Sequence, residues 1–183
     1  MFGSIVCRQS DDGGQMPFDT WPGRLTAAAT ALVMPSTAIL VNACDAHADN
    51  QRLNYGVFTN ISEAQKLNGC QVDPHKDGRL IEAARRHSLD VRNNPAVNDD
   101  IGSDGSTPGD RAAAAGFVGK VSETIAINPA VAISGIEILN QWWYDPASRA
   151  TMQDCRNTAI GVWTENSLGR TVVVAVYGQP AAS

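Results

Sequence analysis

The sequence is poor in several kinds of residue, and each shortage narrows what the protein can do. It contains three histidines and four cysteines in 183 residues, and acidic residues outnumber basic ones by 19 to 14. The basic residues are scattered, so no positive surface is expected to hold nucleic acid or an anionic membrane. Heptads and longer internal repeats are also missing, which argues against a coiled coil or a solenoid. Nucleic-acid binding is therefore set aside.

The remaining composition is that of a globular protein. Apolar residues make up 43% of the chain and charged residues 18%, as in soluble proteins with a hydrophobic core. A length of 183 residues suits one domain with an additional segment.

The additional segment is expected at the N-terminus. Residues 25–43, LTAAATALVMPSTAILVNA, carry no charge, follow Arg24 and precede the polar stretch CDAHADNQR. This order is typical of an export signal. Pro35 within the run argues against a buried core helix, and the many small residues would make a weak permanent transmembrane anchor.

These features predict four regions. Residues 1–15 are expected to be an upstream extension from a wrongly assigned start, because their acidic residues do not suit the beginning of a signal. Residues 16–44 are the predicted export signal, 45–53 a polar linker and 54–183 the folded domain. The mature chain would then contain no membrane span.

The residues around Cys44 leave two forms of the exported protein open. Val41 and Ala43 precede Cys44 as in a bacterial lipoprotein signal, which predicts lipidation of Cys44, although Asn42 fits that pattern badly. Cleavage after Ala43 by the ordinary signal peptidase is the alternative. The protein is thus expected to be secreted or held at the cell surface or envelope.

Only Cys70 and Cys155 then remain in the domain. Two cysteines in an exported domain are expected to form one disulfide, with two buried free thiols as the alternative.

Apolar spacing and capping signals predict the elements of the domain. Helices are expected over residues 54–67 and 78–92, with a short helix ending at Ala115. Another helix is expected to start at Asn128–Pro129 and end at Asp145–Pro146, with an apolar stripe of Ala132, Ile136, Leu139 and Trp143. Strands are predicted over 118–127, 158–164 and 170–177. The sum is an α+β layer fold with a small, mostly antiparallel sheet.

Five motifs stand in a fixed order within residues 54–178. They are LIEAARRHSLDV (80–91), IGSDGSTPGDRAAAAGF (101–117), SETIA (122–126), WWYDPASRA (142–150), and IGVW (160–163) followed by TVVVAVYG (171–178). In this order they resemble the bacterial branch of the CAP superfamily, the cysteine-rich secretory, antigen 5 and pathogenesis-related proteins, whose domain is also called SCP. The resemblance implies an α-β-α sandwich and fits a bridge between Cys70 and Cys155.

The resemblance also implies where a functional cleft would lie. Family members with the full motif set hold a divalent metal between two histidines and two acids. At the matching positions this chain has Asp100 and Ser148 in place of both histidines, keeps Glu123, and has Asp145 near the second acid. Zinc is not expected without the imidazoles, whereas the carboxylates suit weakly bound calcium or magnesium, or share protons with one another. No other cofactor is expected.

The chain's own histidines do not replace the missing ligands. His47 falls in the predicted linker and His75 in a solvated turn, while His87 lies on the apolar stripe of its helix. There a core histidine that donates to a backbone carbonyl is expected. Hydrolysis would rest on Glu123 as base and Ser148 as nucleophile without a histidine to activate it, so catalysis is the less favoured interpretation.

The loop DDIGSDGSTPGDR, residues 99–111, is interpreted as structural. It lacks the lysine of a phosphate-binding loop and the regular acid spacing of a calcium loop. Asp104–Gly105 is expected to form a tight turn, and Arg111 is expected to pair with Asp104 or Asp110.

The favoured function is a non-catalytic, exported CAP domain that binds a lipid or sterol-like ligand, an envelope component or a protein partner. Trp142 is a candidate cleft residue for such a ligand. A weak hydrolase acting through Glu123 and Ser148 is the alternative, and a purely structural surface lipoprotein held through Cys44 is a third candidate. The sequence leaves the oligomeric state open.

Overall fold

The computed structural model describes residues 43–129 and 133–181. The predicted upstream extension and almost all of the predicted export signal lie outside these residues and stay predictions. The polar linker predicted for residues 45–53 is wrong, because helix α1 (Ala43–Leu67) runs through it. Asn50 donates to the carbonyl of Thr164 and Leu53 packs against the core, so this polar stretch still presents an inward face.

The elements follow one another as helices mixed with short strands. After α1 come β1 (His75–Lys76), α2 (Gly78–Asn93), α3 (Pro108–Ala114), β2 (Gly119–Asn128), α4 (Gly135–Tyr144), α5 (Pro146–Gln153), β3 (Ala159–Ser167) and β4 (Arg170–Pro180). None of the helices in the described part of the chain is both long and apolar enough to cross a membrane.

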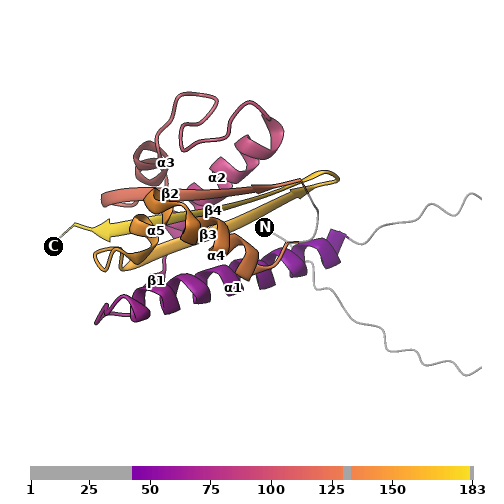
Figure 1. The fold of residues 1–183 in the computed structure, drawn as a ribbon. Helices are drawn as coiled ribbons and strands as arrows, with labels where there is room; N and C mark the ends of the chain where they lie inside the picture. Colours follow the sequence, from indigo (N-terminus) through magenta and orange to yellow (C-terminus); the bar gives the residue numbers. More distant parts are fainter. Residues whose placement is uncertain (1–42, 130–132, 182–183) are drawn as a thin grey trace, which may run out of the picture. The chain divides into compact units, whose positions relative to one another are not determined.

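The four strands form one sheet in the order β1-β3-β4-β2. The β3–β4 and β4–β2 pairings are antiparallel, and β1 lies parallel to β3. Helices α2 and α3 cover one face of the sheet, and α1, α4 and α5 cover the other (Figure 1). The predicted α+β fold, an α-β-α sandwich with a mostly antiparallel sheet, is confirmed.

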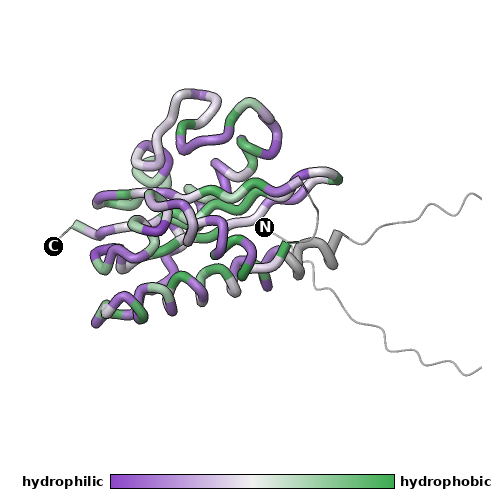
Figure 2. Tube along the Cα trace, in the orientation of Figure 1, coloured by the Kyte–Doolittle hydropathy of each residue, from purple (hydrophilic) through white to green (hydrophobic). Residues whose placement is uncertain are grey.

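The central strand β4 explains why the sheet is buried on both faces. Its run TVVVAVY is hydrophobic at every position from Val172 to Tyr177, and the strands carry long hydrophobic stretches in Figure 2. Side chains alternate along a strand, so Val172, Val174 and Val176 face α2 and α3, while Val173, Ala175 and Tyr177 face α1, α4 and α5. One apolar strand thus supplies two cores.

Helix α2 packs directly against the backbone of strand β3 at Gly161. A Cβ added to Gly161 of β3 would lie 2.1 Å from the carbonyl carbon of Leu80 in α2. The backbones of helix and strand are therefore in direct contact, and this contact fixes the height of α2 above the sheet.

The disulfide between Cys70 and Cys155 is present, with 5.1 Å between the two Cα atoms. It joins the segment after α1 to the turn between α5 and β3, across 85 residues of sequence. The alternative of two free thiols is thereby excluded in this structure.

Three predicted boundaries differ from the structure. Helix α4 begins after Ser134, which caps it together with Glu137, whereas Asn128 still belongs to β2. Asp145 ends α4 as predicted but also caps a further helix, α5. His75 is exposed as predicted, but with Lys76 it pairs with β3 as strand β1; two residues are too few to show a periodicity.

Candidate functional site

Strand β2 carries Glu123 into the layer of α2 and α3. Its neighbours at a spacing of two residues, Val121 and Ile125, pack against the apolar cluster beneath α2, whereas Thr124 faces Tyr177 in the other layer. The side chain of Glu123 is fully buried. A buried carboxylate needs partners that offset the loss of its hydration, and two side chains provide them.

These partners come from α2 and α3. His87 Nδ1 lies 2.5 Å from Glu123 Oε1, and Arg111 Nη2 lies 3.1 Å from Glu123 Oε2. Arg111 Nη2 also approaches His87 Nδ1 to 3.1 Å, so the three groups form one buried network. Sequence analysis had identified Glu123 but neither of its partners.

The partners of His87 indicate which of its ring nitrogens carries the proton. The shorter contact of Nδ1 is with a carboxylate, which accepts only, so Nδ1 carries hydrogen and donates to Glu123. The prediction that His87 donates to a backbone carbonyl is wrong, because a buried carboxylate lies within reach of the ring. The other nitrogen, Nε2, is buried and has no hydrogen-bond partner among the described residues.

Arg111 joins the network to the loop after α2. Its Nη1 donates to the carbonyl of Ser106 at 2.7 Å, and its Nη2 donates to the carbonyl of Asp100 at 2.8 Å. The predicted pairing with Asp104 or Asp110 is wrong, because the guanidinium points inward to Glu123 and the exposed loop carboxylates accept from nearer hydroxyls and amides. The structural interpretation of the loop is supported.

The loop is also held from α2 by Asp90. The backbone N–H and the hydroxyl of Ser103 donate to its two carboxylate oxygens at 2.7 and 2.6 Å. Burial alone would raise the pKa of Asp90, but the hydrogen bonds from Ser103 and Asn94 outweigh it and lower that pKa. The predicted tight turn is present, with Gly105 donating to the carbonyl of Gly102.

Asp145 and Ser148 meet at the start of α5. Asp145 caps this helix by accepting from the backbone N–H of Ser148 at 2.8 Å. Hydrogen bonds from the Ser148 side chain and from this backbone N–H hold the pKa of Asp145 below its usual value. Both residues therefore serve the local geometry of the α4–α5 junction.

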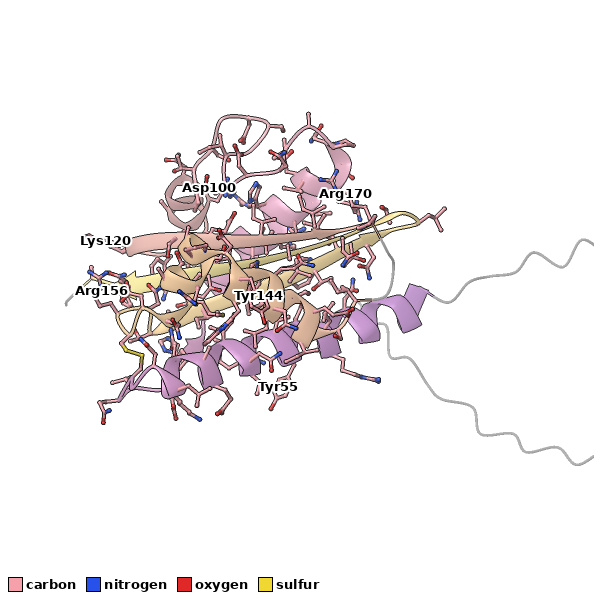
Figure 3. The ribbon with its side chains drawn as sticks, viewed as in Figure 1. Tyr55, Asp100, Lys120, Tyr144, Arg156 and Arg170 are labelled. Atoms are coloured by element: carbon pink, nitrogen blue, oxygen red, sulfur yellow. A yellow bond between two sulfur atoms is a disulfide. The ribbon has the colours of Figure 1, made fainter. Side chains whose placement is uncertain are left out.

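The four predicted cleft residues do not come together as one set. The backbone of Asp100 is close to Glu123 through Arg111, but its side chain is exposed on the side of α2 and α3 (Figure 3). Asp145 lies at the end of α4, in the opposite layer. In the part of the chain that the structure describes, no three histidine, cysteine, aspartate or glutamate side chains gather closely enough to hold a metal ion. The predicted calcium or magnesium ligands are thus not assembled.

Trp142 is not a cleft residue. It is 2% exposed and packs in the core with Ile138, one turn earlier in α4, while Trp143 is half-buried beside it. The predicted stripe named the wrong inward positions: Ile136 is exposed, whereas Ile138 and Trp142 face the core, with Leu139 and Trp143 partly buried beside them. The capping pattern Ser134-Gly-Ile-Glu137 is the sequence signal that would have placed the start correctly.

Two further hollows are lined by other elements. A polar one of about 640 Å³ lies between α5, β2 and the end of β4 and includes Lys120 and Arg156, which share one end of the sheet in Figure 3. An apolar one of about 300 Å³ lies between α1 and β3 and includes Tyr55, Phe58 and Trp163. Sequence analysis missed both, because each is made of segments far apart in the chain.

Comparisons with known proteins agree on the fold. No family model and no curated protein matches the sequence. A solved structure of an outer surface protein from Borrelia burgdorferi has a TM-score of 0.59 at 16% identity, over 68% of this chain and 90% of that one. An extracellular protein with an SCP domain from Bacillus anthracis has a TM-score of 0.66 at 15% identity, over 76% and 44%. This chain has the SCP fold.

A cysteine-rich secretory protein from Staphylococcus aureus is similar as well, with a TM-score of 0.57 at 8% identity, over 71% of this chain and 39% of that one. The chain thus spans less than half of the Bacillus and Staphylococcus proteins. The predicted resemblance to the CAP superfamily is confirmed at the level of the fold. Within this fold the carboxylate of Glu123 is buried and paired with His87 and Arg111.

Proposed function

We propose that this chain is an exported SCP-fold module that binds a lipid-like component of the cell envelope and does not act as an enzyme. The observation that carries the proposal is the position of Glu123, whose carboxylate is fully buried between His87 and Arg111. A carboxylate held in this way is not available to a metal ion or to water in an open cleft.

Two observations support export. The disulfide between Cys70 and Cys155 is of the kind that persists in oxidising compartments outside the cytosol. Two of the similar structures are described as an outer surface protein and an extracellular protein. Export would proceed through the signal predicted over residues 16–44, with Cys44 as the candidate lipidation site.

The apolar hollow between α1 and β3 supports a lipid-like ligand. Its walls include Phe58, Val162 and Trp163, and Tyr55 at its margin is 63% exposed. Lys76 Nζ lies 4.4 Å from the ring centroid of Tyr55 and 5.0 Å from that of Phe58. An apolar hollow with one cation at its margin suits a short acyl chain that ends in an anionic group.

The N-terminus and the intact mass of the protein, recovered from its exporting host, test the first half of the proposal. We expect a chain that starts at Cys44 and carries either lipid or a free amino group, with two hydrogens fewer than the reduced form. Incorporation of a fatty-acid probe that is lost in Cys44→Ser would identify the lipoprotein form. An uncleaved chain confined to the cytosol would overturn export.

Extraction of lipids from the purified protein, followed by mass spectrometry, tests the second half. Tyr55→Ser removes the aromatic ring at the margin of the hollow, and Tyr144→Ser removes a tyrosine that is 82% exposed on α4. We expect co-purified lipid to fall severalfold in Tyr55→Ser and to stay unchanged in Tyr144→Ser. Equal loss in both variants, or no lipid in the parent protein, would remove this ligand.

The hydrolase alternative has little geometric support. Ser148 is tied to Asp145 at the start of α5, and Glu123 points into the opposite layer. An esterase and amidase screen with Ser148→Ala as the comparison tests it. Turnover by the parent protein that disappears in Ser148→Ala would favour the hydrolase over the binding module.

A further inference from the structure

We propose that the hollow between α2, α3 and the loop 99–107 is a binding site for a small amine rich in hydrogen-bond donors, with His87 Nε2 as its buried acceptor. This hollow has a volume of about 410 Å³. Its lining residues differ from those of the apolar hollow, so the inference does not rest on lipid binding or on export.

The first observation is an unfilled acceptor. His87 is 1% exposed and is one of the residues that line the hollow, and its Nε2 has no hydrogen-bond partner among the described residues. Nδ1 carries the proton that Glu123 accepts, and Arg111 already balances the charge of Glu123. Nε2 therefore presents a lone pair, and a buried lone pair without a donor is costly.

The second observation is the charge around this acceptor. The hollow is lined by three aspartates and two arginines: Asp90, Asp104, Asp110, Arg86 and Arg111. Arg111 is paired with Glu123, whereas Arg86 shares Glu82 with Arg85, so the three aspartates are set against Arg86 alone. The unbalanced charge of the lining is thus negative, which favours a cationic occupant.

The two observations together narrow the chemistry of the occupant. A donor for Nε2 combined with positive charge describes a protonated amine, since a metal ion would need three ligands that this part of the chain does not gather. The hydroxyls of Ser103 and Ser106 and the rim carboxylates add acceptors. An amino sugar, which has one ammonium and several hydroxyls, matches this set and fits a hollow of this size.

Nuclear magnetic resonance of the His87 ring tests the site directly. The purified full chain is titrated with glucosamine and, separately, with glucose, which has a hydroxyl in place of the amine. We expect glucosamine to shift the Nε2 signal in a saturable way and glucose to leave it nearly unchanged. A shift by both sugars alike, or by neither, would overturn the proposal, the latter leaving Nε2 to an ordered water.

Matched variants then locate the ligand without disturbing the buried network. Asp104→Asn and Asp110→Asn change exposed rim carboxylates, whereas Asp73→Asn changes an exposed carboxylate outside the hollow. We expect each rim variant to weaken glucosamine binding by about threefold and Asp73→Asn to have no effect. Equal weakening in all three would mean that net charge and not a built site attracts the sugar.

Discussion

The two helical layers are attached to the same sheet by different means. On one side α1, α4 and α5 pack through a continuous apolar cluster. The disulfide between Cys70 and Cys155 also links the segment after α1 to the turn after α5. On the other side α2 and α3 also bury apolar residues, but they close over a network of charged and polar groups around Glu123. One layer is stabilised by hydrophobic burial and a cross-link, and the other depends on a buried ion pair.

This difference predicts which of the two layers is more sensitive to a single substitution. Apolar packing tolerates substitutions of similar volume, whereas a buried ion pair tolerates the loss of neither partner alone. The layer of α2 and α3 is thus the one in which a single substitution is expected to have the larger effect. It is also the layer in which the loop 99–107 and the hollow beside His87 lie.

The largest expected effect comes from breaking the ion pair on one side only. Glu123→Ala leaves Arg111 buried without its carboxylate and is expected to lower the free energy of unfolding by about 4 kcal/mol. Denaturant unfolding measures this change. The double variant Glu123→Leu with Arg111→Met removes both charges and is expected to be more stable than Glu123→Ala. A double variant that is less stable would contradict the view that the unpaired charge causes the loss.

Removal of the cross-link is expected to have the next largest effect. Cys70→Ser with Cys155→Ser frees a loop of 85 residues and is expected to cost about 3 kcal/mol, chiefly through the entropy of the unfolded chain. Thermal unfolding with and without a reductant gives the same comparison in the parent protein. A parent protein that is equally stable in both conditions would show that the apolar cluster alone holds this layer.

Particular residues show how much of this arrangement the sequence could predict. The run TVVVAVY, the stripe of α2 and the two domain cysteines each carry a local signal, so β4, α2 and the bridge were predicted. The five ordered motifs predicted the fold. These features depend on periodicity, composition or order, all of which can be read along the chain.

The partners within the candidate site could not be predicted in the same way. His87 and Arg111 come from two other elements, α2 and α3, and contact Glu123 only in the folded chain. The close packing of α2 on Gly161 of β3 brings His87 near the sheet. Sequence distance gives no information on such a contact between three elements. Trp142 was misplaced for a different reason, because the inward stripe was drawn through Ile136 and Trp143, whereas Ile138 and Trp142 form the buried pair of α4.

A smaller effect is expected from a buried polar pair in the apolar layer. Thr124 Oγ1 and Tyr177 Oη lie 3.0 Å apart in the core, and burial raises the pKa of Tyr177. Tyr177→Phe removes the hydroxyl and leaves Thr124 without this partner, at an expected cost of about 1 kcal/mol. Tyr55→Phe, at an exposed ring, serves as the control and is expected to be neutral. A cost near that of Glu123→Ala would show that the two layers are equally sensitive to the loss of a polar partner.

The smallest expected effect is a pH dependence at the start of α2. The Arg79 side chain, with the backbone N–H of the same residue, donates to Asp77 and holds the pKa of Asp77 below its ordinary value near 4. Because the folded pKa is depressed, the stabilisation is fully present above that ordinary value and is lost as the pH falls through the folded pKa. Arg79 is about half exposed, so the contribution is expected to stay under about 1 kcal/mol.

Asp77→Asn isolates this contribution, because asparagine keeps the cap but not the charge. The stability difference between the parent protein and Asp77→Asn is expected to shrink as the pH is lowered from about 5 to about 2, as measured by denaturant unfolding at each pH. Acid sensitivity that is equal in both proteins would have to arise from carboxylates other than Asp77. A difference that stays constant with pH would show that Asp77 acts through its geometry alone.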